Sequence, residues 1–437
     1  MIRQSIQLAL LFTASLQLGA QIPRNITFLG DAGAQRVVPC PDNDAGTITF
    51  DFPNFAGQSN DFDPDTIYLC FGDTLPVLHN QDWTINGDPN PATPAGVAYA
   101  FYDCRPTVDG PDTMAVLNDP CLNKSNPLVV GGVSFPQTNG IWVAVDDDQG
   151  NVNLINNGFH QEAFNMGNPA PIQLWFAPIT VDNINLLAYE NGGPCVSVSI
   201  GEAFSVVYLE AIEVTETFPD TGPGLQGAFS VENGLPEFEP GTTYGPITIS
   251  HLGGDILAGT VLTPNPGHGD TVQYTLPRPG EYEVVIEDGK SCAGVDTIVM
   301  PVIFSAGAAN GAPGDTVCVE IRVDNLVDVT NAQFTLIWDP AVLDFVEVSN
   351  LNSMLPGLDG SAFGTTPNLT DQGQLTFGWA DLLFGNNSLP DGSVLFEACF
   401  EITGALGQSS PIGFSDMPLD IQVGSVNNTP FQYPFET

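Results

Sequence analysis

The chain has 437 residues and a formal net charge of −43, because 51 aspartates and glutamates stand against only 8 lysines and arginines. So few cations exclude nucleic acids and anionic membrane surfaces as partners, since both are bound largely through lysine and arginine. A disordered acidic chain is excluded as well, because 43% of the residues are hydrophobic. The 46 glycines and 37 prolines favour short strands joined by turns, so we expect an all-β fold. The resemblances given below imply that it consists of tandem β-sandwiches.

The N-terminus has the pattern of a secretory signal peptide over residues 1–20. Arg3 supplies a positive charge, residues 8–18 form a short apolar stretch, and small residues precede Gln21. The apolar stretch is too short to span a bilayer. The alternative is a buried N-terminal helix. We expect a secreted or cell-surface protein whose mature chain has no membrane span.

The first segment after the signal peptide, residues 21–215, predicts an all-β domain. Its strand candidates are rich in β-branched and aromatic residues and are separated by turn residues. They are residues 47–52, 66–71, 97–102, 140–145, 172–176, 196–200 and 204–212. No stretch here has a sustained helical period of apolar residues. The sequence does not indicate what this domain binds.

Eight cysteines without any CxxC spacing favour structural disulfides in an oxidising compartment. In the first segment, Cys104 and Cys121 bracket a loop and are candidates for one bond. Cys70 and Cys195 lie in or beside predicted strands and are candidates for a second bond, which leaves Cys40 over. The sequence alone leaves this connectivity open.

A linker rich in proline and glycine opens a second segment, residues 216–303. From Tyr282 to Ile286, apolar and mostly polar residues alternate as in a half-buried strand. Together with the cysteine that follows, Cys292, this run resembles the closing strand of the Ig-like or PKD-like repeats of bacterial surface adhesins. The resemblance implies a small β-sandwich. The repeats usually have Asn-Gly before the cysteine, where this chain has Lys-Ser, and Cys292 has no partner within the segment.

The third segment, residues 304–437, carries the most specific pattern. It contains four runs with the alternation of strands, the second interrupted by an Asp-Pro pair. These runs are residues 314–323, 331–348, 372–381 and 391–402. The residues after 426 read as an unfinished approach to a further strand, so we expect the chain to continue past Thr437.

In order and spacing the four runs resemble the cohesin domain, with its GDTVxVxVxV, FxLxYDPxVLxFxxV, GxLxFxWAD and GxLFxxxFxI patterns. The resemblance implies a jelly-roll β-sandwich that binds a protein partner, a dockerin, which uses calcium. The family's recognition surface includes an Asn and an Asp at the start of the strand that leads to the Asp-Pro turn. In this chain Asn331 matches the Asn, and Gln333 stands where the family has the Asp. Asp381 ends the WAD run, whose loop often borders the partner. The resemblance also places Cys318 and Cys399 in neighbouring strands and so implies a disulfide.

Motifs of catalysis are missing from the sequence. The four histidines are scattered without HExxH spacing, and no GxSxG elbow occurs. Carboxylates are so numerous that no single pair indicates a glycosidase. We therefore expect a protein that is not an enzyme.

Three aspartate-rich turns are candidate calcium sites, because calcium prefers oxygen ligands. The candidate ligands are Asp42, Asp44, Asp61, Asp63, Asp65, Asp146 and Asp148. None of the three turns follows the EF-hand register. The alternative is that these carboxylates lie in solvated turns. Calcium is the one cofactor that the sequence indicates.

Two functions fit these patterns. The favoured one is an exported adhesion or scaffold protein whose cohesin-like segment binds a protein partner. The alternative is a carbohydrate-binding component of a polysaccharide-degrading system, in which Trp83, Trp142 and Trp175 would stack on sugar rings. A row of exposed aromatic side chains would favour a polysaccharide or a cell-surface glycan as ligand. A flat polar sheet face around Asn331 and Gln333 would favour a protein.

Overall fold

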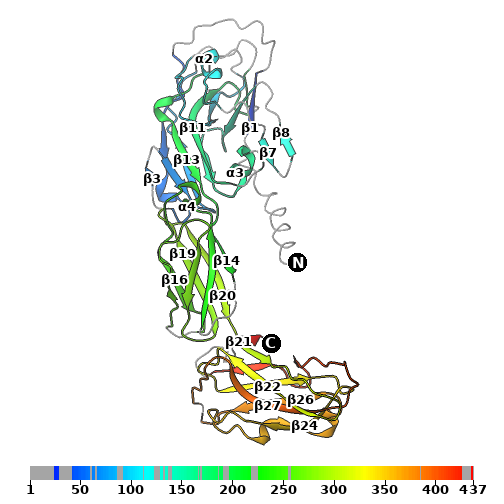
Figure 1. The fold of residues 1–437 in the computed structure, drawn as a ribbon. Coiled ribbons are helices and arrows are strands. Elements are labelled where there is room, and N and C mark those ends of the chain that lie inside the picture. Colours follow the sequence, from blue (N-terminus) through cyan, green and yellow to red (C-terminus); the bar gives the residue numbers. More distant parts are fainter. Residues whose placement is uncertain are drawn as a thin grey trace. The chain divides into compact units, whose positions relative to one another are not determined.

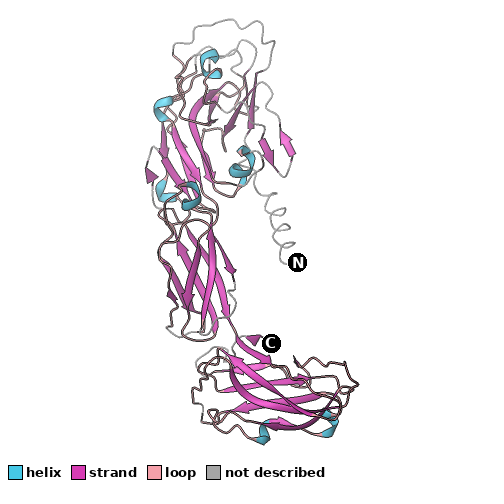
Figure 2. Ribbon diagram, viewed as in Figure 1, coloured by secondary structure: helices cyan, strands magenta, loops and turns pink. Residues whose placement is uncertain are grey.

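The chain folds into two compact units in a computed structural model. The first unit comprises residues 1–212, 232–244 and 287–293, and the second comprises residues 213–231, 245–286 and 294–437. The structure describes residues 24–28, 42–59, 62–63, 66–85, 92–111, 113–122, 128–130, 133–135, 140–165, 167, 170–185, 187–189, 196–217, 225–253, 257–383, 385–425 and 435–436. The predicted signal peptide lies outside these ranges. Figure 2 shows that strands dominate both units and that the helices are short, which confirms the all-β prediction.

The first unit is built around two sheets and a hairpin (Figure 1). The larger sheet has the order β12 (Ala188–Tyr189), β1 (Arg24–Phe28), β9 (Gly140–Ala144), β6 (Gly96–Tyr102), β11 (Ile172–Val181), β13 (Phe204–Tyr208), β4 (Thr66–Leu69) and β3 (Phe62–Asp63). The smaller sheet has the order β10 (Val152–Ile155), β5 (Thr74–His79) and β2 (Ile48–Phe50), and the hairpin pairs β7 (Leu128–Val130) with β8 (Val133–Phe135). The short helices are η1 (Phe52–Asn54), α2 (Thr113–Leu117), α3 (Phe159–Phe164), η2 (Ile200–Glu202) and α4 (Leu235–Phe238).

Strand β6 shows why the sequence of the first unit has little alternation of apolar and polar residues. All seven of its residues are buried, because the strand lies between two hydrophobic clusters. Ala98 and Ala100 belong to one cluster, and Tyr99 and Phe101 belong to the other. A strand covered on both faces is a continuous apolar run rather than an alternating one. The segment predicted as a strand at residues 196–200 forms only an isolated bridge and the start of η2.

Seven strands between residues 213 and 300 form two further sheets. One has the order β14 (Glu213–Thr217), β15 (Gln226–Glu232), β18 (Thr271–Thr275) and β17 (Thr260–Val261), and the other β16 (Ile247–His251), β19 (Gly280–Glu287) and β20 (Ala293–Met300). The predicted alternation in β19 is confirmed, since Tyr282, Val284 and Ile286 are buried between more exposed neighbours. The resemblance to adhesin repeats stays a prediction.

The C-terminal part of the second unit is a sandwich of two five-stranded sheets (Figure 1). The first has the order β24 (Leu343–Ser349), β27 (Ser393–Ile402), β22 (Thr316–Asp324), β21 (Val302–Ala306) and β30 (Phe435–Glu436). The second consists of β25 (Phe363–Gly364), β26 (Gln374–Ala380), β23 (Asn331–Ile337), β28 (Gly413–Ser415) and β29 (Gln422–Gly424), the last two both pairing with β23. Helices η3 (Gly360–Ala362) and α5 (Pro367–Thr370) lie in the connections.

Aromatic rings fill the space between these two sheets. Phe334 of β23 lies 4.8 Å from Phe377 of β26 and 5.0 Å from Phe304 of β21, measured between ring centroids. Phe396 of β27 lies 5.3 Å from Phe377. Because side chains of a strand alternate between its faces, burying Phe334 turns Gln333 and its alternate neighbours outward. The core therefore fixes which residues the outer face presents.

Two predicted disulfides are confirmed. Cys104 is bonded to Cys121 within the first unit. Cys318 of β22 is bonded to Cys399 of β27, and the two residues are direct cross-strand partners with Cα atoms 3.9 Å apart. Cys399 is buried, whereas Cys318 is exposed to solvent.

The predicted bond between Cys70 and Cys195 is wrong. Cys70 is bonded to Cys292, which lies 222 residues later. The reason is that residues 287–293, the turn between β19 and β20, belong to the first unit and bring the two Cα atoms within 5.2 Å. That distance suits a disulfide. Cys40 and Cys195 lie outside the described residues.

Candidate protein-recognition face

The outer face of the sheet around β23 and β26 is the strongest candidate site. Asn331 pairs with Ala380 across the two strands, and Gln333 pairs with Gly378. Paired residues of antiparallel strands lie on the same side of a sheet, so these four form one continuous patch. On its other side β23 pairs with β29, where Gly424 is opposite Asn331.

Small and uncharged residues make up this recognition face. Its outward-facing residues on β23, β26, β28 and β29 are Asn331, Gln333, Thr335, Ile337, Gln374, Thr376, Gly378, Ala380, Gly413, Ser415, Gln422 and Gly424. None of them carries a charge, in a chain whose net charge is −43. A Cβ at Gly424 would lie 2.0 Å from Oδ1 of Asn331, so a larger residue there would displace the Asn331 side chain. The strand residues of the face are therefore mostly polar and uncharged, and the exposed carboxylates of Asp416 and Asp420 lie in the loop beside them.

A loop at residues 416–421 lies along one part of the face. The Thr335 hydroxyl accepts a hydrogen bond from the N–H of Leu419 and donates one to the carbonyl of the same residue, both at 3.1 Å. Nε2 of Gln333 donates to the carbonyl of Asp420, also at 3.1 Å. Thr335 is consequently buried, and Gln333 holds the loop while remaining partly exposed. Asn331 is also partly exposed, and its Oδ1 accepts a hydrogen bond from the Thr330 hydroxyl.

Asp381 lies at the end of β26 and organises the turn that follows. Its side chain is only 8% exposed. The carboxylate accepts hydrogen bonds from the backbone N–H groups of Leu383 at 2.9 Å and Gly385 at 3.1 Å and from the amide of Asn387 at 3.1 Å. The bonds from Asn387 and Leu383 hold the pKa of Asp381 below its usual value, so the group stays ionised. The Asp381 carboxylate therefore forms its hydrogen bonds within the turn and is little exposed to solvent.

This turn presents two leucines that the sequence analysis did not single out. Leu382 is 84% exposed and Leu383 is 89% exposed. Such exposure is unusual for adjacent large apolar residues and marks candidates for contact with a partner. Trp379, in contrast, is buried, and its Nε1 donates to the carbonyl of Pro356 at 2.9 Å. The apolar contribution to the face therefore comes from the leucine turn and not from the tryptophan.

We expect Asp381→Ala to loosen the leucine turn without unfolding the domain. The N–H groups of Leu383 and Gly385 lose their acceptor, so their hydrogen exchange should accelerate by about 10-fold or more. Amide exchange followed by NMR or mass spectrometry measures this. The matched control is Asp371→Ala, at an exposed position of the same domain, which should leave both amides unchanged. Unchanged exchange in Asp381→Ala would contradict the positioning role.

The aspartates predicted to bind calcium are not gathered into a metal site in the described part of the chain. There, no group of three or more His, Cys, Asp or Glu residues could hold an ion. Asp44 accepts hydrogen bonds from Gly46 and Ser199, and Asp146 accepts two from Asn153. Asp42 and Asp148 are exposed; Asp63 is described only through its backbone in β3, and Asp61 and Asp65 lie outside the described residues. Calcium binding stays a prediction.

The tryptophans form no row of exposed rings. All five lie in described residues, and none of them belongs to the exposed class. Trp142 is buried, and Trp83 and Trp175 are partly buried. The guanidinium of Arg105 lies 5.7 Å from the centre of the Trp175 ring.

Among the described residues, no helix has the length and apolar character needed to cross a membrane.

The fold and the face together define the class of this segment as a jelly-roll β-sandwich with an open, uncharged sheet face. Residues 302–429 match the family model of the cohesin domain. This part of the chain is a cohesin domain, as the sequence predicts. A comparison with curated proteins gives no match.

Solved structures of cohesins are similar to this chain. They include the sixth cohesin of scaffoldin B from Acetivibrio cellulolyticus, in complex with a Cel5 dockerin mutant, at 19% identity over 32% of this chain and 95% of that one, with a TM-score of 0.26. The cohesin CaCohA2 of Clostridium acetobutylicum has 18% identity over 31% and 89%, with a TM-score of 0.26. A non-cellulosomal cohesin of the archaeon Archaeoglobus fulgidus has 20% identity over 31% and 84%, with a TM-score of 0.24.

Proposed function

We propose that the chain is an exported, non-enzymatic adhesion or scaffold protein whose cohesin domain binds a protein partner of the dockerin type. The observation that carries the proposal is the flat, uncharged face of β23 and β26 with the exposed leucine turn at its end. The central parts of protein interfaces are depleted of charged residues, and exposed apolar side chains beside such a patch add contact area. Export is supported by the signal-peptide pattern and by the three disulfides among the described residues.

The uncharged face also suits the partner. A chain of net charge −43 repels other acidic proteins wherever its carboxylates are exposed. A partner that binds calcium carries carboxylates of its own, and the uncharged strand residues of the recognition face do not repel them. In this proposal calcium belongs to the partner, so binding is to be measured with calcium and with a chelator. Glycan binding has less support, because the tryptophans form no exposed row.

Gly378→Arg tests the face directly. A Cβ at Gly378 meets nothing nearer than 3.9 Å, so a side chain fits there without disturbing the fold. The long arginine side chain stands out from this face and prevents close packing of the two proteins, so binding should weaken by about 100-fold or more. Isothermal calorimetry of the full chain with a panel of purified dockerins gives the affinities.

The matched control for this test is Thr316→Arg, on the exposed side of β22 in the opposite sheet. It adds the same charge to the same domain and should leave the affinity unchanged. If both variants bind as the parent does, the face of β23 and β26 is not the binding site. If no dockerin binds the parent chain and a polysaccharide does, the carbohydrate-binding alternative replaces the proposal.

A further inference from the structure

The disulfide in the sheet opposite the recognition face joins an exposed cysteine to a buried one. Cys318 of β22 is exposed to solvent, whereas Cys399 of β27 is only 2% exposed. Strand β24 lies beside Cys399, and the Ser349 hydroxyl is 3.4 Å from its Sγ. A thiolate opens a disulfide by attacking one of its two sulfurs, and access decides which one. Attack from solvent therefore takes place at Cys318.

Four glutamates surround this bond on the outer face of the sheet. Glu320 of β22 and Glu397 of β27 are direct cross-strand partners two residues from the bond, and Glu401 lies two residues away in the other direction. Glu347 of β24 is directly opposite Cys399. Cross-strand partners and alternate residues of a strand lie on the same side of a sheet. All four carboxylates therefore share the face that carries the disulfide.

These negative charges are hardly offset within the domain. Arg322 is the only lysine or arginine between residues 302 and 437, and it forms an ion pair with Glu320. The same stretch contains no histidine, so the domain has no cation for the other three glutamates. The Glu397 carboxylate is held by the Ser349 hydroxyl at 3.2 Å and by the amide of Asn350 at 3.1 Å. The disulfide thus lies in a fixed acidic environment.

A thiolate that approaches this face is repelled, because it is an anion itself. A carboxylate or sulfonate on the same thiol molecule adds to the repulsion, and an ammonium group offsets it. Alternate residues of a strand are about 7 Å apart, which is within the Debye length of about 10 Å at 0.1 M salt. The glutamates are therefore close enough for this effect to act in ordinary buffers.

We propose that Cys318 is a site of thiol exchange that selects thiols by their charge, reacting with those that carry an ammonium group and excluding those that carry a carboxylate or sulfonate. In the reaction the thiolate attacks Sγ of Cys318 and forms a mixed disulfide with it. The bond between the two cysteines breaks, and Cys399 takes the electron pair as a thiolate. The site goes beyond the partner binding proposed above, since it lies on the other sheet and needs no partner.

Rates with two thiols of different charge test the proposal on the native full chain. The probes are cysteamine, which has an ammonium group, and 2-mercaptoethanesulfonate, which has a sulfonate group. Alkylation of free thiols and peptide mapping by mass spectrometry give the rate at each disulfide, divided by the concentration of thiolate. At Cys318 and low ionic strength, cysteamine should react faster by about 10-fold or more. Salt at 1 M should reduce this ratio to about 2-fold, because it screens the glutamates.

The bond between Cys104 and Cys121 is the matched control in the same molecule. Cys104 is also exposed and Cys121 is also buried. The residues beside Cys104 are Asp103 and Arg105, whose charges offset each other. The ratio of the two rates at this bond should be about 3-fold or less, which measures the effect of the net charge of the whole chain.

Glu397→Gln with Glu401→Gln should lower the ratio at Cys318 to about 3-fold, because half of the local carboxylates are removed. Equal rates of the two thiols at Cys318 in low salt would overturn the proposal, as would no reaction there with either thiol. A ratio at Cys104 as large as that at Cys318 would overturn it too, since the net charge would then be the cause. The salt dependence is measured on the parent chain, so the test does not depend on the folding of a variant.

Discussion

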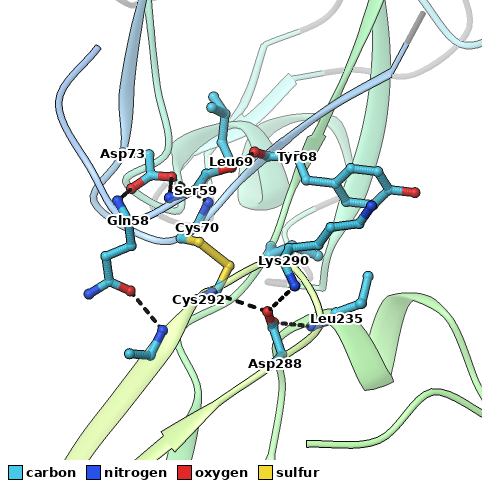
Figure 3. The surroundings of a disulfide bond; sticks show 12 residues. Gln58, Ser59, Tyr68, Leu69, Cys70, Asp73, Leu235, Asp288, Lys290 and Cys292 are labelled. Carbon is cyan, nitrogen blue, oxygen red and sulfur yellow. Dashed lines mark hydrogen bonds between the residues drawn. A yellow bond between two sulfur atoms is a disulfide. The ribbon is translucent and has the colours of Figure 1, made fainter. Parts of the chain in front are cut away.

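Replacing Cys70 and Cys292 together by alanine is expected to lower the free energy of unfolding of the first unit by about 5 kcal/mol. The bond restricts the unfolded chain over 222 residue steps, and the entropic effect of a cross-link grows with the logarithm of the loop it closes. Non-covalent contacts, such as that between Lys290 and the Tyr68 ring (Figure 3), still hold the turn at residues 287–293 in the variant. Denaturant unfolding, followed by intrinsic fluorescence, measures the change.

The matched control for this prediction is the pair Cys104→Ala and Cys121→Ala in the same unit. Their loop has only 17 residue steps, so the same entropic argument gives a loss of about 3 kcal/mol, roughly 2 kcal/mol less than for the long loop. The test is therefore which of the two double variants loses more free energy of unfolding. An equal or larger loss in the Cys104 and Cys121 variant would contradict the account based on loop length.

Alternation predicted those strands that are buried on one face only. It placed Tyr282, Val284 and Ile286 inward in β19, because that strand has one buried and one more exposed face. It could not predict the bond between Cys70 and Cys292. Cys70 and Cys292 lie in different segments of the sequence, whereas the turn that carries Cys292 belongs to the first unit of the structure. Such a contact depends on tertiary structure and leaves no local signal.

The sequence predicted which strand carries the recognition face, but not the hydrogen bonds and exposed leucines of the turn after β26. The cohesin pattern placed Asn331 and Gln333 on the outer face of β23, where the structure has them. Asp381 was expected near the partner, but its role in the turn depends on the geometry of residues 383–387, which no spacing rule supplies. The signal for Leu382 and Leu383 was present, since two consecutive leucines in a turn cannot both be buried in a core.

A buried histidine makes the first unit sensitive to acid. His160 of α3 is 3% exposed and lies among the rings of Tyr208, at 4.5 Å, and of Phe101 and Phe164, at 5.8 and 6.0 Å. Within the described residues its Nδ1 has no hydrogen-bond partner. Burial in this aromatic environment lowers the pKa of His160 to about 3, from an ordinary value near 6.5.

We expect this histidine to destabilise the folded unit progressively as the pH falls. Above pH 6.5 the ring is neutral in both states and has no effect. Between pH 6.5 and about 3 the unfolded chain binds a proton that the folded chain does not, so the free energy of unfolding falls. The loss should be about 2 kcal/mol at pH 5 and about 4–5 kcal/mol near pH 3, at 1.36 kcal/mol per pH unit.

His160→Phe isolates this contribution, because a phenylalanine fits among the same rings and binds no proton. Other groups oppose the effect: burial raises the pKa of Asp73 and Asp288, whose protonation favours the folded state as the pH falls. The quantity to compare is therefore the difference between parent and variant in denaturant unfolding from pH 7 to pH 4. The variant should become more stable than the parent, in free energy of unfolding, by a margin that grows as the pH falls. The control is His268→Phe, at an exposed position in the second unit, which should leave the pH dependence of the first unit's stability unchanged. A difference that stays constant with pH would mean that His160 is protonated in the folded unit.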